Sequence, residues 1–381
     1  MLEYSTVPAI QDDSGGSSQQ EEPVRLNDAE ATKRLRNGLI SLVLLVALIT
    51  GLLLAVPGLH GVGDVVSDMN PWWLLAAVVM EILSCLGYVL AFLQVFDRAP
   101  VRFGARVALS ELAFGAAVSL GGAGSVAVGA WLLVERGGPP GRIAERSAVL
   151  FLLTSAVNVL TLAIVGLGVW IGLLPGPGNV LLSLVPGLVG VVVLLFFLAL
   201  PSVTERTAAR RAPGRLRTAL NATATTIRST FELLRTPDWR LIGAFAYLWC
   251  DIAVLVACFH AAGASPPLAP IILAYQIGYL SNLIPVPGGI GILDGSLVGM
   301  LVLYGINATK ATAATIVYHG IALWIPAMWG TVAFLILRRT RHHPIDLRPP
   351  RSERRALRAA RRRLRGAARR RKGGDESPRT R

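Results

Sequence analysis

The strongest constraint on this chain is a break in its apolar sequence at Pro285–Asp294, which contains two prolines, three glycines and a carboxylate. The apolar segments beside it, Pro270–Ile284 and Ile290–Leu303, have about 15 residues each, whereas crossing about 30 Å of hydrocarbon takes about 20 helical residues. Prolines and glycines leave backbone groups that lipid cannot satisfy, so the break must be buried in protein or face a watery cavity. The stretch predicts a re-entrant helical hairpin with its glycine tip inside the membrane, where transporters form binding sites.

Composition places the chain among polytopic membrane proteins. Of its 381 residues 53% are hydrophobic and only 16% are charged, the mean hydropathy is +0.56, and several apolar runs reach the length of a membrane span. The formal net charge of +14 is concentrated in two polar loops and the C-terminal tail, which indicates anionic membrane lipid as a partner and no nucleic acid. The three cysteines, Cys85, Cys250 and Cys258, fall inside apolar segments and form no disulfide or metal framework; no cofactor is expected.

The apolar runs predict an all-α protein with six full spans and two re-entrant hairpins. Basic loops lie on both sides of the first hairpin, Val107–Leu120 with Val126–Val134, so it enters and leaves from the cytoplasm, and the positive-inside rule also places both termini there. His60–Asn70 is expected to be a short outer loop, and the Arg-rich insert 201–240 a helix lying on the inner leaflet. The six full spans are Gly38–Val56, Trp72–Phe96, Ser147–Leu173, Val180–Leu200, Leu241–Ala262 and Ala313–Leu337.

The two halves of the chain share one order of long and short apolar segments, which predicts an inverted repeat of three spans and one hairpin per half. The spacing G-G-x-G recurs at Gly121 and Gly288, and a carboxylate lies near the middle of the second span of each half, at Glu81 and Asp251. Because three spans reverse the direction of the chain, the second half must run upside down. The expected parts are a disordered cytoplasmic arm (1–36), a first transmembrane repeat (37–174), a second repeat (175–337) containing the basic insert (201–240), and an Arg-rich cytoplasmic tail (338–381).

The break and the last span resemble the flippase-like transmembrane family, which is the membrane region of lysylphosphatidylglycerol synthases and also occurs as stand-alone proteins. The resemblance rests on Pro287–Asp294, on Gly305 one short helix later, and on Trp324–Pro326 in the last span. Two positions depart from the family pattern: Asp294 replaces the usual glutamate, and Ser125 replaces the residue that usually follows the first glycines. The resemblance implies lipid translocation. Because an Arg-rich tail follows the last span where the synthases have an aminoacyl-transferase domain, no synthase activity is expected.

Polar groups inside the hydrocarbon are the candidate functional residues, because burying a charge there costs at least about 2.5–3.5 kcal/mol on insertion scales. The carboxylates could line a shared cavity or, alternatively, cap broken helices and tie spans together. A helix starting after Gly124 or Gly291 would point free N–H groups at a phosphate, whereas the alternative is that the glycines only allow close helix packing. The candidate substrate-binding residues are Gly121, Gly122, Gly124, Gly288, Gly289, Gly291, Asp294, Glu81, Glu111 and Asp251. Structural hydrogen bonding is favoured for the other polar residues in apolar segments, which are Asn158, Gln276, Asn282 and His319.

Two classes of function remain open from the sequence. The first is a lipid transporter that moves an anionic phospholipid or a lipid-linked head group across the plasma membrane. The second is a non-transporting scaffold that docks a lipid- or envelope-modifying enzyme through its basic cytoplasmic surfaces. Paired broken hairpins favour transport, since a scaffold has no need of polar breaks at the midplane. An intramembrane enzyme has little support, because no metal-ligand motif or nucleophile elbow is present.

Overall fold

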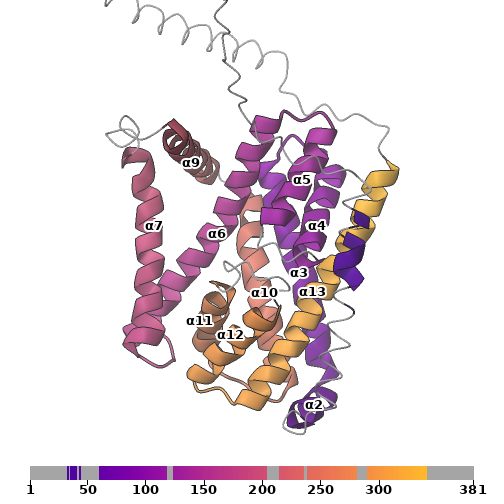
Figure 1. Ribbon diagram of the computed structural model, residues 1–381. Coiled ribbons are helices and arrows are strands. Elements are labelled where there is room, and N and C mark those ends of the chain that lie inside the picture. Colours follow the sequence, from indigo (N-terminus) through magenta and orange to yellow (C-terminus); the bar gives the residue numbers. More distant parts are fainter. Residues whose placement is uncertain are drawn as a thin grey trace, which may run out of the picture.

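The computed structural model describes residues 32–33, 35–40, 43, 60–117, 123–203, 214–235, 238–280 and 290–340. Within these ranges the regular secondary structure is entirely helical, and the long helices form an upright bundle (Figure 1). The longer elements are α3 (Pro71–Val95), α4 (Val101–Ala117), α5 (Ala123–Glu135), α6 (Pro140–Trp170), α7 (Val185–Val203), α9 (Gly214–Arg235), α10 (Ile242–Ala261), α11 (Leu268–Leu280), α12 (Ile290–Leu303) and α13 (Ala308–Arg339). The short ones are α2 (His60–Ser67), η2 (Val180–Leu184) and η4 (Trp239–Leu241).

Five helical stretches are long and apolar enough to cross a membrane. They correspond to five of the six expected spans, and the sixth, Gly38–Val56, lies largely outside the described residues. The third-span helix α6 begins at Pro140, earlier than expected, because proline is well suited to the first helical turn and lets the helix continue through its polar end. The chain is therefore a multi-pass membrane protein whose described part is entirely helical. The five stretches are Pro71–Val95, Pro140–Trp170, Val180–Leu200, Trp239–Ala261 and Ala308–Arg339.

The prediction that His60–Asn70 is a loop is wrong, because His60–Ser67 form helix α2. Val62 and Met69 are buried in a small cluster with Ala261, Ala262 and Ala313, at the ends of α10 and α13. Val65 and Val66 pack against the same cluster, and this spacing of apolar residues is the one that places them on one helical face. The pattern was missed because the helix has only eight residues and because Asp64 and Asp68 lie among the apolar positions.

Two pairs of shorter helices pack against each other: α4 packs on α5, and α11 packs on α12. Figure 1 shows the first pair toward the end of the bundle where α9 lies, and the second toward the end where α2 lies. The helix α4 starts at Val101, before the expected Val107, since the turn at Pro100 already accepts hydrogen bonds from Phe103 N and Gly104 N at 2.9 Å. The connections between the two members of each pair lie outside the described residues.

The Arg-rich insert contains helix α9, as expected, and this helix rests on α6 and α7. Ile227 is buried, and Ser229 Oγ donates a hydrogen bond to Glu145 Oε1 of α6 at 2.9 Å. Phe231 and Leu234, on the expected apolar face, remain exposed. Only part of that face is therefore used for packing within the described chain.

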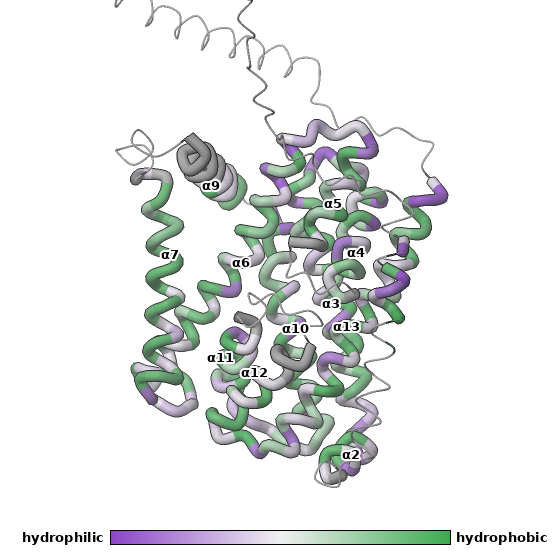
Figure 2. Tube along the Cα trace, viewed as in Figure 1, coloured by the Kyte–Doolittle hydropathy of each residue, from purple (hydrophilic) through white to green (hydrophobic). Residues whose placement is uncertain are grey.

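Helix α7 packs on α6 at one side of the bundle (Figure 1). A Cβ on Gly166 would lie 2.7 Å from Gly187 N, so glycine on both helices permits this close approach. Large apolar side chains on the rest of α7, such as Leu195 and Phe196, are exposed, and Figure 2 shows the helix as almost continuously hydrophobic. A surface of this kind is compatible with lipid and not with water.

Candidate functional site

The centre of the molecule is formed by two antiparallel helices, α3 and α10. Near one end Asn70 N donates to Ala261 O at 3.0 Å, and further along Ser84 Oγ donates to Tyr247 O at 2.8 Å. Residue numbers thus rise along α3 as they fall along α10. This register brings together the two helix segments that carry Glu81 and Asp251.

Glu81 and Asp251, which the sequence places at matching mid-span positions of the two halves, form one site. Their carboxyl groups are close enough to interact electrostatically, Glu81 from α3 and Asp251 from α10. Glu81 is buried, with 4% of its surface exposed, and Asp251 is half-buried. Because neighbouring carboxylates repel each other, the pair can hold a shared proton or a cation.

Two tyrosines fix the position of Asp251. Tyr318 OH of α13 donates to Asp251 Oδ2 at 3.0 Å and to Oδ1 at 3.2 Å, and Tyr275 OH of α11 donates to Oδ2. Both tyrosines are buried, and their rings meet edge to face with centroids 6.3 Å apart. The ring of His319, next on α13, lies against Tyr318 and interacts electrostatically with Asp251. Four helices therefore contribute to the site.

Glu81 is held more loosely than Asp251. Its Oε1 accepts a weak hydrogen bond from Cys85 Sγ at 3.7 Å, one turn along α3. Its Oε2 is buried and has no hydrogen-bond partner among the residues that the structure describes. Buried polar atoms are nearly always satisfied, so Oε2 is a candidate contact atom for a proton, an ion or a substrate group.

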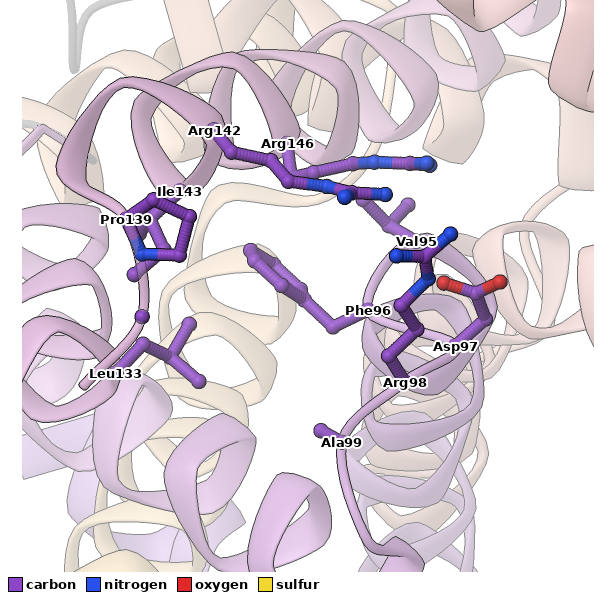
Figure 3. A pocket seen from close by; sticks show the side chains of 11 residues that line it. Val95, Phe96, Asp97, Arg98, Ala99, Leu133, Pro139, Arg142, Ile143 and Arg146 are labelled. Atoms are coloured by element: carbon purple, nitrogen blue, oxygen red, sulfur yellow. The ribbon is translucent and has the colours of Figure 1, made fainter. Parts of the chain in front are cut away.

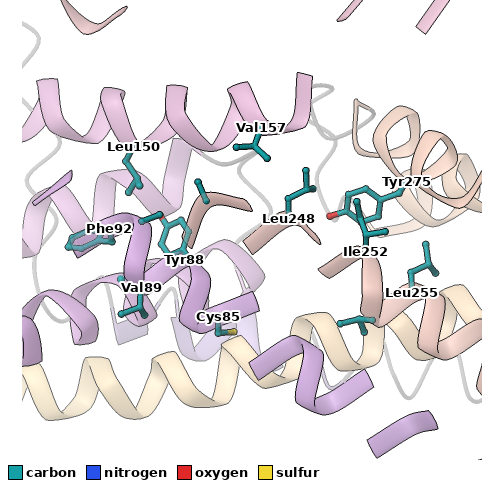
Figure 4. Packing of buried hydrophobic residues seen from close by; sticks show 14 of the residues in the cluster. Cys85, Tyr88, Val89, Phe92, Leu150, Val157, Leu248, Ile252, Leu255 and Tyr275 are labelled. Atoms are coloured by element: carbon teal, nitrogen blue, oxygen red, sulfur yellow. The ribbon is translucent and has the colours of Figure 1, made fainter. Parts of the chain in front are cut away.

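Buried apolar side chains lie beside this site on both of the central helices. Cys85 and Val89 on α3, and Leu248, Ile252 and Leu255 on α10, are buried in the main hydrophobic core. Figure 4 shows Tyr275 beside Ile252 within that core. The carboxyl pair thus lies in an environment of low polarity, where electrostatic interactions are stronger than in water.

Glu111 occupies a separate position, on α4. Glu111 Oε2 accepts a hydrogen bond from Tyr88 OH at 2.7 Å, and only 2% of the surface of Glu111 is exposed. Tyr88 lies on α3 about two helical turns beyond Glu81. The Glu111 side chain lies in a notch at Gly129 of α5: a Cβ there would be 1.5 Å from Glu111 Oε1. These contacts join α3, α4 and α5, which agrees with the structural interpretation of this carboxylate.

Four of the six candidate tip glycines lie outside the described residues. They are Gly121, Gly122, Gly288 and Gly289. Helices α5 and α12 begin at Ala123 and Ile290, so Gly124 and Gly291 fall in their first turns instead of preceding them. Asp294 belongs to α12. The expected phosphate contact at these helix starts stays a prediction.

Of the other polar residues, Asn158 behaves as expected, since its Nδ2 donates to Thr154 O within α6 at 3.0 Å. Gln276 Nε2 is buried without a partner among the described residues, and Asn282 lies outside them. Sequence reasoning missed Tyr88, Tyr275 and Tyr318, the donors to the buried carboxylates. A tyrosine inside an apolar helix was the available signal, because a buried hydroxyl needs a partner.

The sequence profile described as lysylphosphatidylglycerol synthase TM region matches residues 39–330. The chain belongs to this family. One relative is the UPF0104 membrane protein of Methanothermobacter thermautotrophicus, 38% identical over 97 residues, which make up 24% of this chain and 28% of that protein. The resemblance inferred from Pro287–Asp294 is thereby confirmed, and the site formed by α3, α10, α11 and α13 belongs to the family's membrane region up to residue 330.

Proposed function

We propose that this protein moves an anionic phospholipid or a lipid-linked head group across the plasma membrane. The observation that carries the proposal is the Glu81–Asp251 pair, midway along two apolar helices and held by Tyr275 and Tyr318. Charged groups at that depth are costly and typically mark substrate or proton pathways. A docking scaffold has no use for such a pair.

The pair offers a way to couple transport to a proton or cation. Two interacting carboxyl groups can take up and release one positive charge. Uptake of a positive charge would lower the barrier to an anionic head group that passes along the same helices. Glu81 Oε2, which has no hydrogen-bond partner among the described residues, is the atom at which we expect the exchange.

One helix orientation and two contacts support an inverted repeat, the architecture that transporters use for alternating access. The helices that are equivalent in the two halves, α3 and α10, run antiparallel. Glu111 of α4 meets Gly129 of α5, and Gly278 O of α11 accepts a hydrogen bond from Ser296 Oγ of α12 at 3.3 Å. Gly121 and Gly288 are equivalent positions in the repeat. The same offset in residue number relates Glu111 to Gly278 and Gly129 to Ser296.

The proposal is tested by reconstituting the full chain in liposomes that contain a fluorescent anionic phospholipid and measuring its movement between leaflets. We expect flipping above the protein-free rate, and substitution Glu81→Gln or Asp251→Asn should reduce it by at least about tenfold, which is the order of a single lost transition-state interaction. The control Glu145→Gln changes a carboxylate that bonds Ser229 of α9, away from the pair. Wild-type flipping at background level across a panel of anionic lipids would leave the docking scaffold as the better account.

A further inference from the structure

A pocket opens where α3 ends and α6 begins, at the end of the bundle that also holds the α4–α5 pair (Figures 1 and 3). It lies between the turn after α3 and the loop that leads into α6. Its floor is apolar, with Leu133 and Ile143 almost fully buried. None of the residues assigned above to the Glu81–Asp251 site lines it.

Three arginines face this pocket. Arg142 and Arg146 lie one turn apart on α6, and Figure 3 shows their head groups extending side by side over Phe96 toward Arg98 on the opposite wall. Asp97 is the single acidic residue in the lining, so positive charge dominates. Convergence of arginines from two separate segments is a feature of anion sites, because the planar guanidinium matches the oxygens of a phosphate.

The surroundings distinguish Arg142 and Arg146 from a solvated surface patch, whereas Arg98 on the opposite wall is exposed. Arg142 and Arg146 are half-buried, and their neighbours Val95, Leu133 and Ile143 are buried and apolar. Partial burial strengthens the attraction between a guanidinium and an anion, since less water screens the charges. A site with an apolar floor and a cationic rim suits an amphiphile that carries a phosphate at the boundary between hydrocarbon and water.

We propose that this pocket binds the phosphate group of an anionic lipid. The inference deepens the proposed function by naming the group that is held at one end of the bundle, and it rests on that function for the presence of lipid. The pocket would hold the head group at the level where α3 leaves its apolar segment. Movement toward the Glu81–Asp251 pair would then proceed along α3.

The pocket can be tested by binding alone, so that failure of the site and failure of translocation are told apart. Full-length protein in detergent is incubated with phosphatidylglycerol or phosphatidylcholine, and retained lipid is counted by native mass spectrometry. The variants are the pairs Arg142→Gln with Arg146→Gln and Arg142→Lys with Arg146→Lys. Arg102→Ala is the matched control, because Arg102 is exposed on α4 at the same end and does not line the pocket. A competition arm adds inorganic phosphate at the same concentration as the lipid.

We expect the wild type to retain phosphatidylglycerol in preference to phosphatidylcholine, and the glutamine pair to weaken that binding by at least about tenfold. The lysine pair keeps the charge and should retain most of the binding, and the Arg102 variant should match the wild type. Should the glutamine pair fail to fold, as judged by its melting temperature, Arg98→Gln provides the same comparison from the opposite wall. Equal retention of both lipids, or undiminished binding by the folded glutamine variants, would overturn the proposal. Displacement of the lipid by inorganic phosphate at equal concentration would also overturn it, because the pocket would then be a site for a free anion.

Discussion

Gly87 and Gly243 bring the backbones of α3 and α10 into direct contact. A Cβ on Gly243 would lie 2.6 Å from Gly87 O, and a Cβ on Gly87 would lie 2.9 Å from Gly243 O. Neither glycine has a positive φ, so their importance is the absence of a side chain and not a special backbone conformation. This contact sets the separation of the two helices about two turns along from the carboxyl pair.

Substitution of Gly87 or Gly243 by leucine should therefore separate α3 from α10. Forcing extra atoms into a packed interface costs about 1–3 kcal/mol, and we expect the melting temperature in detergent to fall by at least about 3 °C. The control is Gly299→Ala on α12, where an added Cβ meets nothing within 4 Å. A Gly87→Leu variant as stable as the control would show that the helices can part without cost.

A second prediction concerns Glu111 and the notch at Gly129. The variant Gly129→Ala should destabilise the protein, because its Cβ would occupy the position of Glu111 Oε1 and displace the carboxyl group from Tyr88. Adding Glu111→Ala to Gly129→Ala should cost less than the sum of the single changes, since the clash is between these two side chains. Thermal unfolding of the four proteins gives the interaction energy, and strict additivity would contradict the arrangement.

The parts of the fold that could be predicted from the sequence follow from the requirements of a bilayer. Apolar length and basic loops located five spans that the structure also contains, and the break at Pro285–Asp294 identified the family. The mid-span positions of Glu81 and Asp251 in the two halves could likewise be predicted. These features depend on local composition or on simple repetition along the chain.

The remainder depends on contacts between distant segments, which local patterns do not determine. Tyr275 and Tyr318 reach Asp251 from two other helices, and nothing in their immediate sequence selects that partner. The glycine contact at Gly87 and Gly243 likewise exists only once α3 and α10 are side by side. The helix α2 was missed for a different reason, because eight residues give too short a periodic signal.

The third prediction concerns topology. Single cysteines at Gly141 and at Ala308, in a background where Cys85, Cys250 and Cys258 are replaced by alanine, should label from opposite sides of the membrane. Both positions are exposed, and they lie at the starts of α6 and α13, toward opposite ends of the bundle in Figure 1.

The charge bias predicts that the Gly141 position labels from the cytoplasm and the Ala308 position from outside. An impermeant maleimide applied to intact cells, followed by lysis and a second label, distinguishes the two. Exposed Ser67→Cys, at the end of α2, is a useful third position, since it should behave like Ala308. Labelling of the Gly141 and Ala308 positions from the same side would rule out the inverted repeat.

The last prediction separates the tyrosines' effect on Asp251 from a general effect on packing. Tyr275→Phe and Tyr318→Phe keep the buried rings but remove the hydroxyl donors, and each hydrogen bond to a charged group is worth about 1.5–3 kcal/mol. Each variant should slow lipid flipping in liposomes. In a background of Asp251→Asn, the same substitutions should have little further effect, because the tyrosines act through this carboxyl group. The control Tyr304→Phe removes a hydroxyl that donates to Leu182 O, at a site without contact to Asp251, and should leave the rate near that of the wild type. A loss of flipping that is as large in the Asp251→Asn background as in the wild type would mean that the tyrosines serve another part of the pathway.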